Sequence, residues 1–248
     1  GKYFSFSQLG YYNRAKQFSD FPSQNFNNVV QRVSFPILSK LQNDKDDLKR
    51  KLQIIIKSTM FISFLSMFLL SALSESLIIT LIGEKWRYAI FYLQLLCFSS
   101  SLYPLQSLNL SVLKVFGRSD LFLRLEVIKI ILALPFLFFG IKLGIEYLII
   151  GQFFTSLISF FLNSYWSKAL INYSSFEQLK NISGSFFFAL IISGIVYIVG
   201  KIFHSSIAPM ILFYQVVAAL IIFFTVGEVF KKSEYEYLKN IFLEYVKI

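Results

Sequence analysis

The stretch NISGSFFFALIISGIVYIVG, residues 181–200, runs for 20 residues without a charged side chain. A helix that crosses a bilayer needs about 20 consecutive, mostly apolar residues. Four more uncharged runs of 17 to 26 residues occur, at Ser58–Ser74, Tyr88–Leu113, Tyr147–Ser167 and Ser205–Gly227. None of them alternates with the period of two that a membrane β-barrel requires. The sequence therefore predicts an all-α polytopic membrane protein.

The composition agrees with this class. Of the 248 residues, 56% are hydrophobic and 15% are charged, whereas soluble domains average about 45–50% and about 25%. A single Cys and a single His provide no ligand set for a metal centre, and we expect neither a metal nor another cofactor. The net charge of +10 would suggest nucleic acid as a partner of a soluble protein, but here the basic residues flank the apolar runs, and we expect no nucleic acid.

Two further segments complete the expected helices. Ile130–Ile141 reaches spanning length if it is extended back to Leu125, and Phe21–Leu41 is an amphipathic segment bounded by charges. We expect a transmembrane bundle over residues 21–230, between an outer loop at 1–20 and a cytoplasmic amphipathic tail at 233–248. Its seven helices are expected at about 21–42, 54–82, 88–113, 121–141, 147–168, 181–203 and 207–230.

The basic residues predict an orientation, because cytoplasmic flanks of membrane helices carry an excess of Lys and Arg. If the connection after the first helix is cytoplasmic, the cytoplasmic flanks hold 15 basic residues and the opposite flanks hold 7. We therefore expect the N-terminus outside and the C-terminus in the cytoplasm.

The segment Phe21–Leu41 is too polar to be surrounded by lipid. It either lies at the membrane surface or spans with a polar stripe that faces a water-filled cavity, and we favour the second arrangement. The stripe supplies the candidate cavity residues Gln24, Asn28, Gln31 and Arg32. The Arg32 guanidinium suits a diphosphate or another anion, or it pairs with a carboxylate outside this chain. Pro36 should remove the helical hydrogen bond to the carbonyl of Arg32.

Lys57 is a second candidate cation for the cavity. Its apolar neighbours lie only on its C-terminal side, so we expect its side chain to extend towards the cytoplasm. The chain contains no phosphate-binding P-loop, no GxSxG motif and no outer pair of carboxylates suited to glycosyl transfer. We therefore expect that the protein is not an enzyme.

Four strings occur in a fixed order: LGYYNRA at 9–15, FPILSKLQ at 35–42, GEKW at 83–86 and FGRSDL at 116–121. This order resembles the Wzx/WzxC-type polysaccharide flippases of the multidrug/oligosaccharidyl-lipid/polysaccharide exporter superfamily. The resemblance covers the whole chain but only the later half of the family pattern. It implies the C-terminal lobe of a two-lobe, MATE-like transporter, with a missing N-terminal lobe as partner. The motif residues are Gly10, Tyr11, Tyr12, Asn13, Arg14 and Pro36, of which Asn13 and Arg14 are expected to have structural roles.

The resemblance also implies an activity. Such proteins move undecaprenyl-diphosphate-linked oligosaccharides to the outer leaflet of the bacterial inner membrane by alternating access. The implied partners are membrane lipids, that lipid-linked oligosaccharide and the polysaccharide polymerase machinery. Two alternatives stay open: another exporter of the superfamily, for lipid II or drugs, and a membrane oligosaccharide ligase or polymerase, which would carry a long outer loop with catalytic residues.

Overall fold

The computed structural model describes residues 4–203 and 206–230, with side chains up to residue 225. These residues form eight α-helices, one 3-10 helix and no strand, which confirms the all-α class. The expected tail at 233–248 lies outside the described residues. The helices, in chain order, are α1 (Phe6–Lys40), α2 (Lys45–Ile82), the 3-10 helix η1 (Glu84–Trp86), α3 (Ala89–Ser101), α4 (Tyr103–Val115), α5 (Ser119–Leu143), α6 (Ile145–Ile171), α7 (Ser175–Ile202) and α8 (Ala208–Phe230).

Four of the described helices, α2, α6, α7 and α8, are long and apolar enough to cross a membrane. The chain is therefore a multi-pass membrane protein. α1 is rich in polar residues, α5 carries several charges, and α3 and α4 have only 13 residues each. For these helices, membrane crossing stays a prediction.

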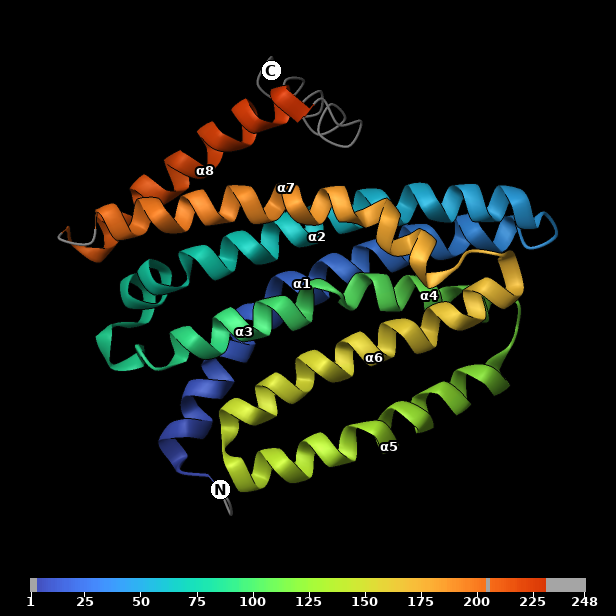
Figure 1. The fold of residues 1–248 in the computed structure, drawn as a ribbon, viewed down its shortest axis with the longest axis horizontal. Coiled ribbons are helices and arrows are strands. Elements are labelled where there is room, and N and C mark those ends of the chain that lie inside the picture. The colour runs from blue at the N-terminus through green and yellow to red at the C-terminus, as the bar shows by residue number, and fades with distance from the viewer. Residues whose placement is uncertain (1–3, 204–205, 231–248) are drawn as a thin grey trace.

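The outer loop expected at residues 1–20 is wrong over its helical part, because α1 begins at Phe6 and continues for 35 residues. Ser5 starts the helix with a capping box: its hydroxyl accepts from Gln8 N, and the Gln8 side chain accepts from Ser5 N, both at 3.2 Å. Pro22 and Pro36 lie inside the helix without ending it. Figure 1 shows that α1 changes direction between its N-terminal part and its long C-terminal run.

The run at 88–113, expected as one helix, is divided at Leu102 into α3 and α4. Pro104, at the second position of α4, has no amide hydrogen to donate to the preceding turn. At the same break, the Ser101 carbonyl accepts a hydrogen bond of 2.8 Å from Ser63 Oγ on α2. A side chain of the neighbouring helix thus contributes to satisfying the backbone where the helix is interrupted.

The helices run back and forth between two ends of the molecule (Figure 1). The connections α1–α2, α4–α5 and α6–α7 lie at one end, and the connections α2–α3, α5–α6 and α7–α8 lie at the other. Of the 15 basic residues predicted to be cytoplasmic, the 11 at 40–51, 114–129 and 168–180 therefore flank connections that share one end, and the other four lie outside the described residues. We name this end, which contains the α1–α2 connection, the basic end.

Close packing joins the helices of this bundle. α7 lies along α2 and α5 lies along α6 (Figure 1). A Cβ added at Gly140 of α5 would come within 2.4 Å of Leu148 Cγ on α6. A Cβ added at Gly151 of α6 would come within 2.8 Å of Phe136 Cβ on α5. Glycine at these two positions permits the close approach of α5 and α6.

A buried cluster of amides ties α4, α6 and α7 together. Asn109 and Gln178 exchange two hydrogen bonds through their side-chain amides, at 2.8 and 2.9 Å. Ser167 Oγ donates to Asn109 Oδ1 at 2.7 Å, and Asn109 Nδ2 also donates to Leu105 O at 3.0 Å. Asn109, Ser167 and Gln178 are fully or almost fully buried, so this amide cluster fixes how the three helices meet.

Candidate functional site: a polar groove along helix α1

A row of polar side chains follows α1 at intervals of four residues. Lys16, Gln24, Asn28 and Arg32 are exposed, and Asp20 is half-buried. Side chains four residues apart on a helix lie one above the other. We call these five residues the α1 ridge. The α1 ridge contains the predicted residues Gln24, Asn28 and Arg32. It continues the same helical face to Lys16 and Asp20, which were expected to lie in a loop.

The first part of the ridge forms one wall of an open groove of about 370 Å³. The other walls come from α3, from α4 with the Leu102 break, and from α6. By the rise of 1.5 Å per residue, Gln152 and Ser159 lie about 10 and 21 Å from the start of α6, so the groove lies beside the middle of a helix long enough to span. We call it the polar groove. Its lining residues are Lys16, Asp20, Ser23, Gln24, Leu96, Ser99, Ser100, Tyr103, Gln106, Gln152, Thr155, Ser156 and Ser159.

Hydrogen bonds fix part of the groove wall. Gln106 Nε2 on α4 donates to the carbonyl and to Oγ of Ser156 on α6, at 3.0 and 2.7 Å. Ser156 Oγ in turn donates to the Ser99 carbonyl on α3 at 3.2 Å. The hydroxyl oxygen of Ser99 is buried and has no hydrogen-bond partner among the described residues. The wall thus presents amides and hydroxyls, groups that can replace water around a polar ligand.

The structure brings three of the predicted cavity residues together on the ridge. Gln24 lines the polar groove, and Asn28 and Arg32 continue the row towards the basic end. In the part of the chain that the structure describes, Arg32 makes no ion pair and no side-chain hydrogen bond. An unpaired, exposed guanidinium on this face is available to an anion.

Gln31 differs from its neighbours on α1. It is half-buried, and its Oε1 accepts a hydrogen bond of 2.6 Å from Ser111 Oγ on α4. Its Nε2 is buried and has no partner among the described residues, and the same is true of Asn27 Oδ1 one turn earlier. Gln31 therefore faces the bundle rather than the exposed side of the predicted stripe, because α4 packs against this side of α1.

Lys57 is separated from the polar groove. It lies in a different groove, between α1 and α2, of about 810 Å³ and lined mostly by Val and Ile side chains. The structure therefore does not bring Lys57 together with the α1 ridge, and a role for Lys57 in the substrate cavity stays a prediction. The periodicity of one helix shows which residues share a face, but it does not show which side of a neighbouring helix this face will contact.

The motif residues near the N-terminus gather around Trp86 of η1. The Tyr11 ring packs edge-on against Trp86 with centroids 5.9 Å apart, and the Arg14 guanidinium lies 5.3 Å from the centre of the Trp86 ring. A Cβ added at Gly10 would be 3.8 Å from Cζ3 of the same ring. The strings LGYYNRA and GEKW, distant in sequence, thus contact each other. This contact agrees with the structural role expected for Arg14.

The remaining motif residues have various surroundings. Tyr12 OH accepts from Gln152 Nε2 on α6 at 3.0 Å, which joins the motif to the rim of the polar groove. Asn13 and Pro36 are exposed. The structural role expected for Asn13 stays a prediction.

The sequence reasoning missed the walls of the groove on α3, α4 and α6. A signal was present: polar residues recur at helical spacing within two of the uncharged runs. Ser99, Tyr103 and Gln106 follow each other at intervals of four and three residues, and Gln152, Ser156 and Ser159 repeat this spacing. Such a stripe within an apolar run is typical of a helix that turns one face to a polar cavity.

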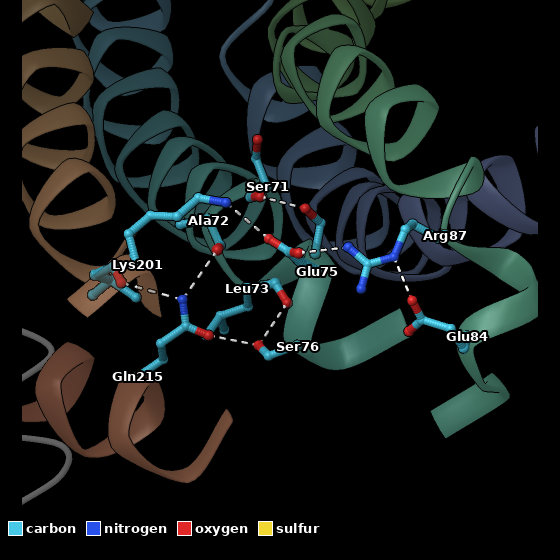
Figure 2. A network of polar contacts seen from close by, with 11 residues as sticks. Ser71, Ala72, Leu73, Glu75, Ser76, Glu84, Arg87, Lys201 and Gln215 are labelled. Atoms are coloured by element: carbon cyan, nitrogen blue, oxygen red, sulfur yellow. Dashed lines mark hydrogen bonds and ion pairs between the residues drawn. The ribbon is translucent and has the colours of Figure 1, made fainter. Parts of the chain in front are cut away.

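A second polar region lies at the end opposite the basic end, where α2, α7 and α8 meet (Figure 2). Glu75 binds Arg87 at 3.0 Å and Lys201 at 3.1 Å, and Arg87 also binds Glu84 at 2.5 Å. Beneath them, buried Gln215 donates to the carbonyls of Ala72 and Val196 and accepts from Ser76 Oγ. We call this region the end network.

No group of three or more His, Cys, Asp or Glu residues that could hold a metal ion occurs among the residues described. The chemistry that the polar groove offers is hydrogen bonding by amides and hydroxyls, with Lys16 and Asp20 as charged groups along one side, and Arg32 lies farther along the same α1 ridge. Such a set suits a ligand with many hydroxyl groups and an anionic part.

Comparison with known proteins gives the chain its relatives. Residues 1–91 match a family model described as polysaccharide biosynthesis protein. The chain is 28% identical, over 53% of its length, to an uncharacterized membrane protein in the cps region of Klebsiella pneumoniae. It is 32% identical over 49% of its length to the teichuronic acid biosynthesis protein TuaB of Bacillus subtilis. It is 29% identical over 53% of its length to the lipopolysaccharide biosynthesis protein WzxC of Escherichia coli.

The matched part spans 25 to 27% of the length of these relatives. No solved structure matches the chain significantly. The family match covers the LGYYNRA and GEKW strings that meet around Trp86, and it includes the whole α1 ridge. Over about half of its length, the chain is thus similar to membrane and polysaccharide biosynthesis proteins that include WzxC.

Proposed function

We propose that this chain is the C-terminal lobe of a transporter that moves undecaprenyl-diphosphate-linked oligosaccharides across the bacterial inner membrane. The observation that carries the proposal is the α1 ridge beside the polar groove, where Gln24, Asn28 and Arg32 have no side-chain hydrogen bond among the described residues. Four of the described helices are long and apolar enough to span a membrane. The relatives named for polysaccharide, teichuronic acid and lipopolysaccharide biosynthesis point to the same class of substrate.

The physical problem of this transport is the cost of moving sugars and a diphosphate through hydrocarbon. A hydroxyl or amide that loses its hydrogen bonds to water without replacement costs several kcal/mol. The amides and hydroxyls of the polar groove would replace water around the sugar, and Arg32 would lie against the diphosphate. The lipid tail would remain in the bilayer. A second, MATE-like lobe opposite α1 would complete the cavity and alternate its opening between the two sides.

The proposal includes an orientation and a chemical outcome. The basic end faces the cytoplasm, because basic residues concentrate in its connections. The transporter returns its substrate chemically unchanged, so it is not an enzyme. The polysaccharide polymerase machinery then uses the delivered unit on the outer side.

The test uses the full-length protein with Arg32→Ala. We expect export of the polysaccharide, and flipping of the lipid-linked oligosaccharide in reconstituted vesicles, to fall about tenfold or more, since hydrogen bonds to charged groups contribute about 1.5–3 kcal/mol. Lys168→Ala is the matched control, because Lys168 is exposed in the last turn of α6 and does not line the groove. Unchanged flipping by Arg32→Ala would refute the cavity assignment, and a chemically altered substrate would favour a ligase or polymerase.

A further inference from the structure

The groove between α1 and α2 carries a charge that nothing described in the chain neutralises. Lys57 lies in the membrane-spanning helix α2, is half-buried, and has no ion pair or side-chain hydrogen bond with the described residues. Around it, Val29, Val33, Ile54 and Ile62 make the groove largely apolar. A lysine in a membrane helix pairs with an anion or extends to the membrane surface, because an unpaired charge in hydrocarbon is costly.

Two hydroxyls beside Lys57 are also without partners. Ser58 and Thr59 line the same groove and make no side-chain hydrogen bond within the described residues. By contrast, Ser34, on the α1 wall, donates to the carbonyl of Val30 at 2.6 Å. The α2 wall thus presents one ammonium and two hydroxyl donors at consecutive positions. Successive side chains of a helix point in different directions, so the long Lys57 side chain is the group of this set that can reach a phosphate in the groove.

The depth of Lys57 indicates that the phosphate belongs to a lipid. Lys57 and Glu75 bound the uncharged run of α2, and at 1.5 Å per residue they lie about 27 Å apart along the helix. The hydrocarbon core of a bilayer is about 30 Å thick. Lys57 therefore lies at the level of the lipid headgroups on the side of the basic end, and Ile62, which lines the same groove, lies about 8 Å deeper along α2.

From these observations we propose that the α1–α2 groove binds an anionic membrane phospholipid. The phosphate lies against the Lys57 ammonium, and an acyl chain lies along Val29, Val33 and Ile62. One ammonium complements the charge of the single phosphate of a phospholipid. The proposal does not depend on transport, because the polar groove lies on the other flank of α1.

The test is photolabelling of the full-length protein with a photoreactive phosphatidylglycerol in phosphatidylcholine vesicles, followed by mapping of the labelled peptides. We expect label on the α2 peptide around residues 54–62, competed by unlabelled phosphatidylglycerol. Lys57→Gln should reduce this labelling about fivefold, because one basic residue near a membrane surface contributes about 1 kcal/mol to binding of an anionic lipid. Lys168→Gln, which removes an exposed lysine outside the groove, should leave it unchanged.

A second variant keeps the charge and fills the groove. Val33 is 59% exposed, so Val33→Trp should fold, and we expect it to reduce labelling as well. Equal labelling by phosphatidylcholine, or labelling unaffected by Lys57→Gln, would overturn the proposal. Displacement of the label by undecaprenyl diphosphate but not by excess phosphatidylglycerol would also overturn it, since the occupant would then be the carrier lipid.

Discussion

Two kinds of polar region occur in this bundle, and they differ in how their groups are partnered. In the end network, Glu75 binds both Arg87 and Lys201, and the amide of Gln215 reaches three partners. Figure 2 shows these contacts converging from α2, α7, α8 and the α2–α3 connection. On the α1 ridge, in contrast, Gln24, Asn28 and Arg32 make no side-chain hydrogen bond with the residues described.

This difference separates polar groups that hold the bundle together from polar groups that are free for a ligand. In a membrane, an unsatisfied polar group costs several kcal/mol unless water or another partner reaches it. The end network and the amide cluster provide their own partners, so we expect substitutions there to change stability. Gln24, Asn28 and Arg32 on the α1 ridge have no such partners among the described residues, so we expect substitutions of these three residues to change transport.

The largest expected effect lies in the amide cluster. Asn109→Leu removes four hydrogen bonds and leaves the buried Gln178 amide without its main partner. We expect the free energy of unfolding to fall by about 2 kcal/mol, since hydrogen bonds inside membrane bundles average about 0.6 kcal/mol each and unpaired amides add a penalty. Reversible unfolding of the full-length protein in mixed micelles measures it. Ser167→Ala, which removes one of the four bonds, should cost less, and equal losses would contradict this ranking.

An intermediate effect is expected on the ridge, and on transport rather than stability. The double substitution Gln24→Leu and Asn28→Leu removes two exposed amides without breaking a hydrogen bond of the described structure. We expect export to fall about tenfold, which corresponds to about 1.4 kcal/mol, with an unchanged unfolding transition. The control is Gln8→Leu, also on α1 but in its capping box, which should affect stability and leave export intact. Normal export by the double variant would mean that the ridge does not contact the substrate.

The sequence predicted the class of this bundle from features that act locally. Two features can be found directly in the order of the residues: uncharged runs long enough to span a membrane, and basic residues between these runs. The runs correspond to helices of the structure, and the basic residues concentrate at one of the two ends of the bundle. The N-terminal helix was missed although Ser5 and Gln8 carry the spacing of a capping box. The break at Leu102 was missed because Pro104 lies inside an uncharged run, where no charged residue marks the end of a helix.

The site was harder to predict, because it depends on which helices become neighbours. Gln24 and Gln31 lie on one polar stripe in the sequence, yet Gln24 lines the polar groove while Gln31 binds Ser111 of α4. Lys57 faces the other flank of α1. Periodicity gives the faces of a helix, but the packing of α3, α4 and α6 against α1 decides which face encloses a groove.

The smallest expected effect lies in the exposed part of the end network. Glu75→Gln removes both ion pairs that join α2 to Arg87 and Lys201, yet the side chains involved are 41 to 54% exposed. Exposed ion pairs contribute about 0–1 kcal/mol, because water screens them and long side chains lose freedom when they pair. We expect the free energy of unfolding to fall by less than about 1 kcal/mol, and the difference from the native protein to shrink in high salt. Unfolding at low and high ionic strength measures this, with export as a second readout that should not change. A loss of stability larger than that of Asn109→Leu would contradict this ranking. An export defect in a stably folded Glu75→Gln protein would mean that a fully partnered network also takes part in transport. The distinction between partnered and unpartnered regions would then no longer separate stability from function.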